Sequence, residues 1–163
     1  MNSCLMAVGD AVERLADMSR ELNNCRSGAA TTMRNGSGTL LPEDAMKDLR
    51  KLRVLIVEDS RHVSDFISQI LDEYPHVEFD IHKAGTLADG LRVAGEVLPD
   101  VVVLDLNLTD SSGELTVAAF QAGHEMVPIV VFTGTDTNGE ACIRAGAQEH
   151  LLKGKLSLDD LLR

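Results

Sequence analysis

The stretch VVVLDLNLTD, residues 101–110, places four consecutive apolar residues directly before a carboxylate, Asp105. A continuous apolar run that ends at turn residues is typical of a strand buried on both faces of a sheet. A carboxylate at the end of such a strand is costly unless a cation or hydrogen-bond donors accompany it. The stretch therefore predicts a buried parallel strand whose last residue, Asp105, needs a partner.

Strand-like and helix-like segments alternate on both sides of this stretch. Apolar or alternating segments predict strands over 53–59, 76–84, 99–106, 127–134 and 147–154. Apolar residues at gaps of three and four predict a helix after each strand, over 61–74, 86–98, 112–123, 137–146 and 157–163. Thr86 is expected to cap the second of these helices. Such alternation predicts an α/β fold in which helices cover both faces of a five-stranded parallel sheet.

The number of repeats narrows the topology. Five strand–helix units within residues 53–163 are too few for an eight-stranded barrel, and right-handed crossovers leave a doubly wound open sheet. Ligands of such sheets bind at the carboxyl ends of the strands, near the point where the strand order reverses. The residues that end the strands are therefore the candidates for a functional site.

Polar side chains end four of the predicted strands. They are Glu58 and Asp59 after the first strand, Asp105 after the third, Thr133 after the fourth and Lys153 after the fifth. Three neighbouring carboxylates repel one another and favour a bound cation, and Mg²⁺ suits an open acidic cleft of oxygen ligands. A metal ion, an ammonium and a hydroxyl together can hold a phosphoryl group. Asp105 is the best candidate for a nucleophile that forms an aspartyl phosphate.

Four segments resemble, in order, the receiver domain of two-component response regulators: RVLIVEDS (53–60), DVVVLDLNLTDSSG (100–113), PIVVFTG (128–134) and GAQEHLLKG (146–154). The resemblance covers about 53–163 and implies a flavodoxin-like, doubly wound (βα)5 fold with strand order 2-1-3-4-5. It implies that Asp105 accepts a phosphoryl group from a histidine kinase or a histidine phosphotransfer protein. By the same resemblance, the chain is a signalling module that assists only its own phosphorylation and dephosphorylation.

The resemblance also implies the metal ligands. Glu58 and Asp59 match the acidic pair that positions Mg²⁺, and Asp105 completes the carboxylate set. The backbone carbonyl of Asn107 matches the third protein ligand of the family. The cofactor expected for this chain is therefore Mg²⁺.

The remaining family positions concern the phosphoryl group and the response to it. Lys153 matches the lysine that contacts the phosphoryl group, and Thr133 matches the hydroxyl that moves toward it. This movement is expected to switch the face of residues 133–153, which then signals to an output domain or partner. Asn107 and Thr135 fall where the family tunes the lifetime of its phosphate.

Two positions depart from the family pattern. His150 stands three residues before the lysine, where the family usually has tyrosine or phenylalanine, and Gly154 stands where proline often follows the lysine. An imidazole could make the relay between threonine and this ring sensitive to pH, although a space-filling ring is the alternative. Neither departure removes a group needed for phosphorylation.

Residues 1–52 are expected to form an extension outside the receiver domain of 53–163. Apolar residues at helical spacing predict one helix over 1–26, followed by a flexible linker over 26–40 and a lead-in helix over 42–52. The first helix either docks on its own domain or mediates self-association or partner binding. The face of residues 133–163 is a second candidate surface for an effector or for self-association.

Composition excludes several classes of partner. Residues 53–163 carry 19 acidic and 8 basic side chains, whereas residues 1–52 carry seven of each. The acidic part would be repelled by phosphate backbones, so no direct nucleic-acid binding is expected. No apolar run approaches membrane-spanning length, no membrane partner is expected, and the expected location is the cytoplasm. The three cysteines, Cys4, Cys25 and Cys142, lack the spacing of a zinc or disulfide framework.

Three other functions remain as alternatives. A receiver-fold module could work by phosphorylation-independent docking or dimerisation. A magnesium-dependent phosphatase or phosphotransferase with an aspartate nucleophile usually carries a second acid two residues later, where this chain has Asn107. A small flavin-binding protein would need a phosphate-binding loop after the first strand and stacking aromatics, whereas that loop is acidic and aromatic residues make up 3% of the chain.

Overall fold

The computed structural model describes residues 8–17, 50–74, 77–134 and 139–153. Five parallel strands form one sheet in the order β2-β1-β3-β6-β7. They are β1 (Arg50–Val57), β2 (Val77–Ala84), β3 (Val101–Leu104), β6 (Ile129–Thr133) and β7 (Glu149–Leu152). Two short strands, β4 (Asn107–Leu108) and β5 (Ser111–Ser112), pair only with each other. The main sheet therefore has the predicted order 2-1-3-4-5, and the doubly wound fold is confirmed.

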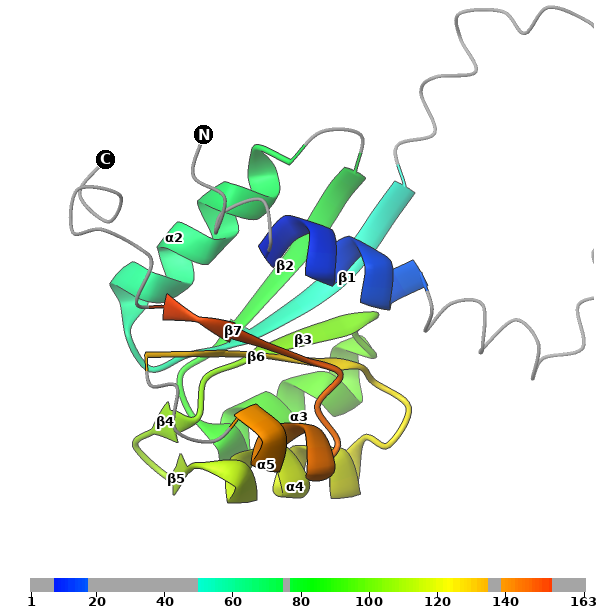
Figure 1. Cartoon of the computed structure of the whole chain (residues 1–163). Helices are drawn as coiled ribbons and strands as arrows, with labels where there is room; N and C mark the ends of the chain where they lie inside the picture. Colours follow the sequence, from blue (N-terminus) through cyan, green and yellow to red (C-terminus); the bar gives the residue numbers. More distant parts are fainter. Residues whose placement is uncertain (1–7, 18–49, 75–76, 135–138, 154–163) are drawn as a thin grey trace, which may run out of the picture.

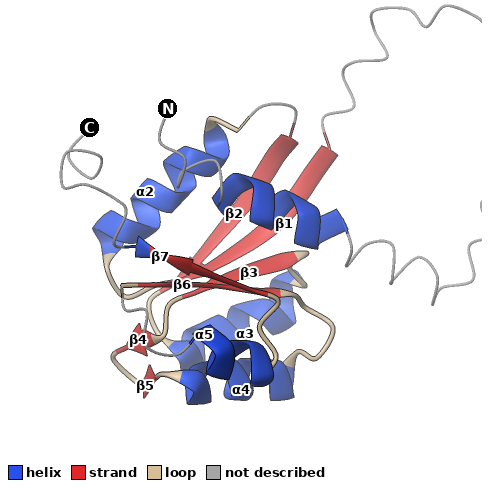
Figure 2. Cartoon of the chain, viewed as in Figure 1, coloured by secondary structure: helices blue, strands red, loops and turns tan. Residues whose placement is uncertain are grey.

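Helices cover both faces of this sheet, as Figures 1 and 2 show. The helix of residues 8–17 and α2 (Arg61–Asp72) lie on one face. On the other face lie α3 (Leu87–Val97), α4 (Glu114–Gly123) and α5 (Gly139–Arg144). Alternate residues of β1 enter the two cores, with Ile56 packed under α2 and Val57 packed under α3. This two-sided burial explains why the central strands are apolar at consecutive positions.

Local signals placed most helices correctly. The side chain of Thr86 accepts a hydrogen bond from the amide of Asp89, so the predicted N-cap of α3 is confirmed. The longest described helix, α2, has 12 residues and spans about 18 Å. A bilayer core of roughly 30 Å exceeds that length. Within the described ranges, no helix is long and apolar enough to cross a membrane.

The start of β1 corrects one prediction. Residues 50–52 belong to this strand, so the lead-in helix predicted over 42–52 is wrong at its end. Parallel pairing with β2 begins at Arg50, opposite Val77, and the side chain of Leu52 is fully buried. Strand pairing thus overrides the helical spacing of a short polar segment. Residues 18–49 and the final helix predicted over 157–163 lie outside the described residues.

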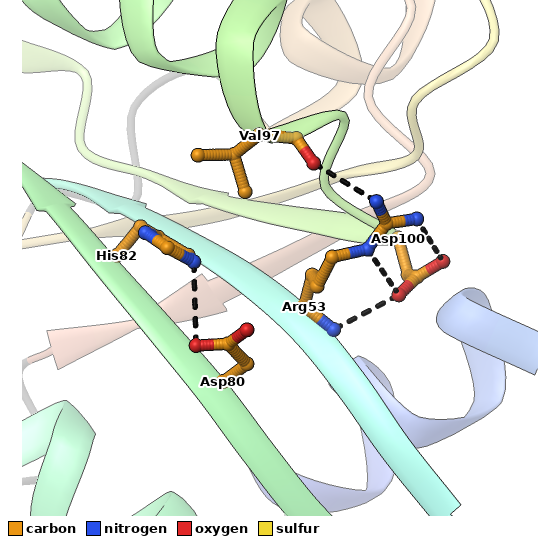
Figure 3. Close-up of polar contacts among 5 residues, drawn as sticks. All are labelled: Arg53, Asp80, His82, Val97 and Asp100. Carbon is orange, nitrogen blue, oxygen red and sulfur yellow. Dashed lines mark hydrogen bonds and ion pairs between the residues drawn. The ribbon is translucent and has the colours of Figure 1, made fainter.

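A partly exposed arginine of β1, Arg53, pairs with the buried Asp100 just before β3 (Figure 3). Asp100 is 6% exposed, and one of its oxygens accepts from the Arg53 amide at 2.9 Å and from the guanidinium Nε at 3.4 Å. The same guanidinium donates to the carbonyl of Val97 at the end of α3. These bonds hold the start of β3 and the end of α3 against β1, at the other end of β3 from Asp105. Sequence patterns gave no sign of this pair.

Candidate functional site

Three carboxylates meet at the carboxyl edge of the sheet. One oxygen from each of Glu58, Asp59 and Asp105 lies within 4.8 Å of the others. The sheet causes this meeting, because β1 and β3 are neighbours and Val57 lies opposite Leu104 in their register. The amide of Asp105 donates to the carbonyl of Val57 at 2.9 Å, which holds the two strand ends together.

Lys153 supplies the partner that Asp105 needs. This residue directly follows β7, and its Nζ lies 2.9 Å from Asp105 Oδ2 and 2.5 Å from Glu58 Oε2. The side chain reaches across β6, and its ammonium lies 5.8 Å from the centre of the Phe132 ring. An ammonium at this distance from an aromatic face is attracted to it. The strands therefore bring Lys153 together with two of the three carboxylates.

The net charge of the cluster is negative and favours the binding of a further cation. Glu58 and Asp105 are 6% and 5% exposed, while Asp59 is exposed. Three carboxylates and one ammonium leave two formal negative charges uncompensated. Burial raises the pKa of Glu58 above its usual range, although the Lys153 ammonium and the Ser60 amide oppose that rise. A bound divalent cation would offset the remaining repulsion between the carboxylates.

Two buried oxygens of the site, Asp105 Oδ1 and Thr133 Oγ1, are not used in hydrogen bonds among the described residues. Unpaired buried polar atoms are rare because each loses its hydration without compensation. The donor set consists of carboxylate oxygens, which hard cations such as Mg²⁺ prefer. These residues therefore fit a divalent cation and an oxyanion bound beside Asp105.

A polar cleft borders two of the three carboxylates, Glu58 and Asp59. Its volume is about 540 Å³, and it is lined by Glu58, Asp59, Arg61, Ser64, Asp65, Lys83, Ala84 and Gly85. Lys83 and Asp65 form an ion pair of 2.7 Å at its wall. The cleft lies beside the end of β1 and the start of α2, next to the acidic pair.

The loop after Asp105 is anchored by a residue that sequence reasoning missed. Asp110 accepts hydrogen bonds from the amides of Leu87 and Ala88 at 2.8 and 3.0 Å, at the start of α3. These amides hold the pKa of Asp110 below its usual range. Capping patterns reveal only caps that are local in sequence, whereas Asp110 lies 23 residues after Leu87, the first residue of this helix. The anchored loop carries the exposed Asn107 in β4.

Of the two positions that depart from the receiver pattern, His150 lies among the described residues and Gly154 does not. His150 lies in β7 against α5, where a Cβ added to Gly139 would be 3.0 Å from its Nδ1. Its Nε2 is buried and has no hydrogen-bond partner among the described residues. The ring lies beside α5, and both interpretations of His150 stay predictions. Thr135 and Gly154 lie outside the described residues.

Comparison with known proteins identifies the family. The model of the response regulator receiver domain matches residues 54–163. The chain belongs to this family. This family has the doubly wound parallel sheet described above. The recognition of the four sequence segments as a receiver pattern is thereby confirmed.

Curated relatives and solved structures agree with this assignment. The protein-glutamate methylesterase/protein-glutamine glutaminase of Oceanobacillus iheyensis is 30% identical over 116 residues, which are 68% of this chain and 33% of the relative. The response regulator domain of Thermotoga maritima CheB superposes with a TM-score of 0.58 at 21% identity, over 68% of this chain and 86% of that one. The Mn²⁺-bound response regulator Rcp1 gives the same values. The chain spans about a third of the length of the first methylesterase relatives.

Proposed function

We propose that this chain is a phosphorylation-dependent switch in which Asp105 accepts a phosphoryl group in a Mg²⁺-dependent reaction. The observation that carries the proposal is the contact of Lys153 with both Glu58 and Asp105, next to a carboxylate oxygen that has no other partner among the described residues. A purely structural ion pair would not need the third carboxylate, Asp59, at the same place. The donor would be a histidine kinase or a histidine phosphotransfer protein.

Each residue would have a distinct part in the transfer. Asp105 attacks phosphorus with a carboxylate oxygen, the bond from phosphorus to the donor breaks, and the donor leaves with that electron pair. Lys153 neutralises an oxygen of the transferred group, and the Thr133 hydroxyl donates to another. Glu58, Asp59, Asp105 and the carbonyl of Asn107 would hold Mg²⁺, which offsets the charge on the phosphoryl oxygens when it is bound.

Several observations support this proposal. Membership of the receiver family implies signalling by phosphorylation. The response regulator Rcp1, which has a similar fold, has been solved in a Mn²⁺-bound form. Methylesterase activity is not proposed for this chain, because the match covers only a third of those relatives. Phosphorylation-independent docking or dimerisation remains the alternative function.

The test is phosphorylation by a small donor. The full chain is incubated with acetyl phosphate, with Mg²⁺ or with excess chelator, and its intact mass is measured. The expected result is the gain of one phosphoryl group that requires Mg²⁺ and is lost in Asp105→Asn. Asp110→Asn is the matched control, because Asp110 lies in the same loop but contacts α3, and it should still be phosphorylated. A folded chain that gains no phosphoryl group and binds no beryllofluoride would contradict the proposal.

A further inference from the structure

The helix of residues 8–17 occupies a specific surface of the receiver body. Five of its side chains are at most 5% exposed and follow the spacing of one helical face: Val8, Ala11, Val12, Leu15 and Ala16. They share a core with side chains of α2, β1, β3 and β6. Figure 1 shows this helix beside α2 on the same face of the sheet. The surface is therefore a helix-binding site whose occupant comes from the same chain.

Tyr74 makes one side of this surface selective. Its hydroxyl lies 2.5 Å from Asp10 Oδ1 and 3.0 Å from Glu13 Oε2, and donation to these carboxylates raises its pKa. The Tyr74 ring lies against Gly9, where an added Cβ would come within 2.4 Å of a ring carbon. The surface thus fits a helix that has glycine at one position and acids one and four residues later.

The other side of the helix contacts β7. Arg14 forms an ion pair with Glu149, the first residue of that strand. Leu151, two residues later in β7, packs against the same core as the helix. The helix is therefore held between the end of α2, through Tyr74, and the strand that leads to Lys153.

Strands β6 and β7 connect the helix to the phosphorylation site. Phe132 of β6 is buried in the core that contains the helix, and the Lys153 ammonium lies over its ring. Thr133 follows Phe132 directly, and it pairs with Leu152 of β7. A movement of Thr133 or Lys153 toward a phosphoryl group would thus disturb side chains on which the helix packs.

We propose that binding of helix 8–17 to this surface and phosphorylation of Asp105 oppose each other. The inference rests on the proposed function. With the helix bound, Lys153 is paired with Glu58 and Asp105, and the Thr133 hydroxyl has no partner within the described residues. A phosphoryl group on Asp105 draws the Lys153 ammonium and the Thr133 hydroxyl toward itself. This movement disturbs β6 and β7, on which the helix packs, and so weakens the binding of the helix. By linkage, a chain whose helix binds more weakly has a higher affinity for the phosphoryl group.

The experiment compares full-length variants. Gly9→Ala pushes a methyl group into the Tyr74 ring, and Tyr74→Phe removes the bonds to Asp10 and Glu13. Gly95→Ala in α3 is the matched control, since its Cβ would be 3.9 Å from the nearest side chain. Calorimetry measures the affinity for beryllofluoride with Mg²⁺, and hydrogen exchange measures the opening of residues 8–17.

Gly9→Ala and Tyr74→Phe should bind beryllofluoride about fivefold more tightly than the parent, and Gly95→Ala should bind it like the parent. Beryllofluoride should also accelerate exchange at residues 8–17 of the parent. Bound beryllofluoride with unchanged or slower exchange there would overturn the inference and leave the proposed function intact. A parent that binds no beryllofluoride would overturn both. A parent dimer that dissociates in Gly9→Ala would place the helix on a second copy and overturn docking within one chain.

Discussion

The unpaired hydroxyl of Thr133 makes a strong prediction about stability. Thr133 and Thr116 are both 0% exposed, but among the described residues only the Thr116 hydroxyl has a partner, the Ser111 hydroxyl at 2.7 Å. Valine replaces the hydroxyl by a methyl group of similar size. A buried polar group without a partner costs about 1–3 kcal/mol, whereas a typical hydrogen bond contributes about 1 kcal/mol. The same substitution should therefore have opposite effects at the two positions.

We expect Thr133→Val to raise the free energy of unfolding by about 1 kcal/mol or more, and Thr116→Val to lower it by about 1 kcal/mol. Urea unfolding of the Mg²⁺-free protein measures both values, and the dependence on urea concentration should not change. Each change corresponds to a few degrees in the unfolding midpoint temperature.

Thr133→Val should weaken the binding of a phosphoryl analogue even though it stabilises the fold. Thr133→Val removes a donor to the phosphoryl group, so beryllofluoride should bind at least about fivefold more weakly, while Thr116→Val should bind it like the parent. A Thr133→Val chain that is destabilised as much as Thr116→Val would refute the reasoning, because its hydroxyl would then have a partner in the unphosphorylated protein.

Three further predictions concern the site and its frame. Gly146 has φ +117°, and a Cβ added there would lie 2.9 Å from Gln121 Cγ. Gly146→Ala should therefore lower the free energy of unfolding, measured by urea titration, by about 1–3 kcal/mol. Gly85→Ala is the control and should have little effect, because its Cβ would have open space. The pKa of Asp110 is lowered in the folded chain, so its contribution is complete above the usual value of 3.8 and is lost as the pH falls through the lowered pKa. Asp110→Asn should therefore be less stable than the parent at neutral pH, and a difference that persists unchanged in strong acid would contradict this. Because the pKa of Glu58 is raised, its ionisation at neutral pH opposes folding, so Glu58→Gln should not be less stable than the parent without Mg²⁺. The same variant should lose the rise in unfolding temperature that Mg²⁺ gives the parent, and a retained rise would show that Glu58 is not a ligand.

The sequence predicted the sheet because its signals are local and repeated. The apolar runs of β3 and β6 reflect burial on both faces. The strand order came from the resemblance to receiver domains, since right-handed crossovers only limit the possible topologies. The start of β1 was missed because residues 50–52 become a strand only by pairing with β2. The β4–β5 hairpin has two residues in each strand, which is too short for a periodic pattern.

The candidate site was predictable to the extent that topology decides it. Parallel strands bring their carboxyl ends to one edge, so residues 58, 105 and 153 could be placed together from strand order alone. The anchor of Asp110 and the position of Phe132 under Lys153 depend on contacts between distant segments. The spacing of residues 8–17 showed an apolar face but could not show which surface covers it. Tyr74 and Glu149 supply that information only in the folded chain.

The central claim is that Asp105 itself carries the phosphoryl group, and one measurement tests it most directly. The chain is phosphorylated with acetyl phosphate and Mg²⁺ and then reduced with sodium borohydride, which converts an aspartyl phosphate into homoserine. Peptide mass spectrometry then locates the converted residue. We predict homoserine at position 105 in the phosphorylated sample and aspartate there when Mg²⁺ is chelated. Conversion at another residue, or none despite a gain of phosphate in the intact mass, would contradict the assignment of Asp105.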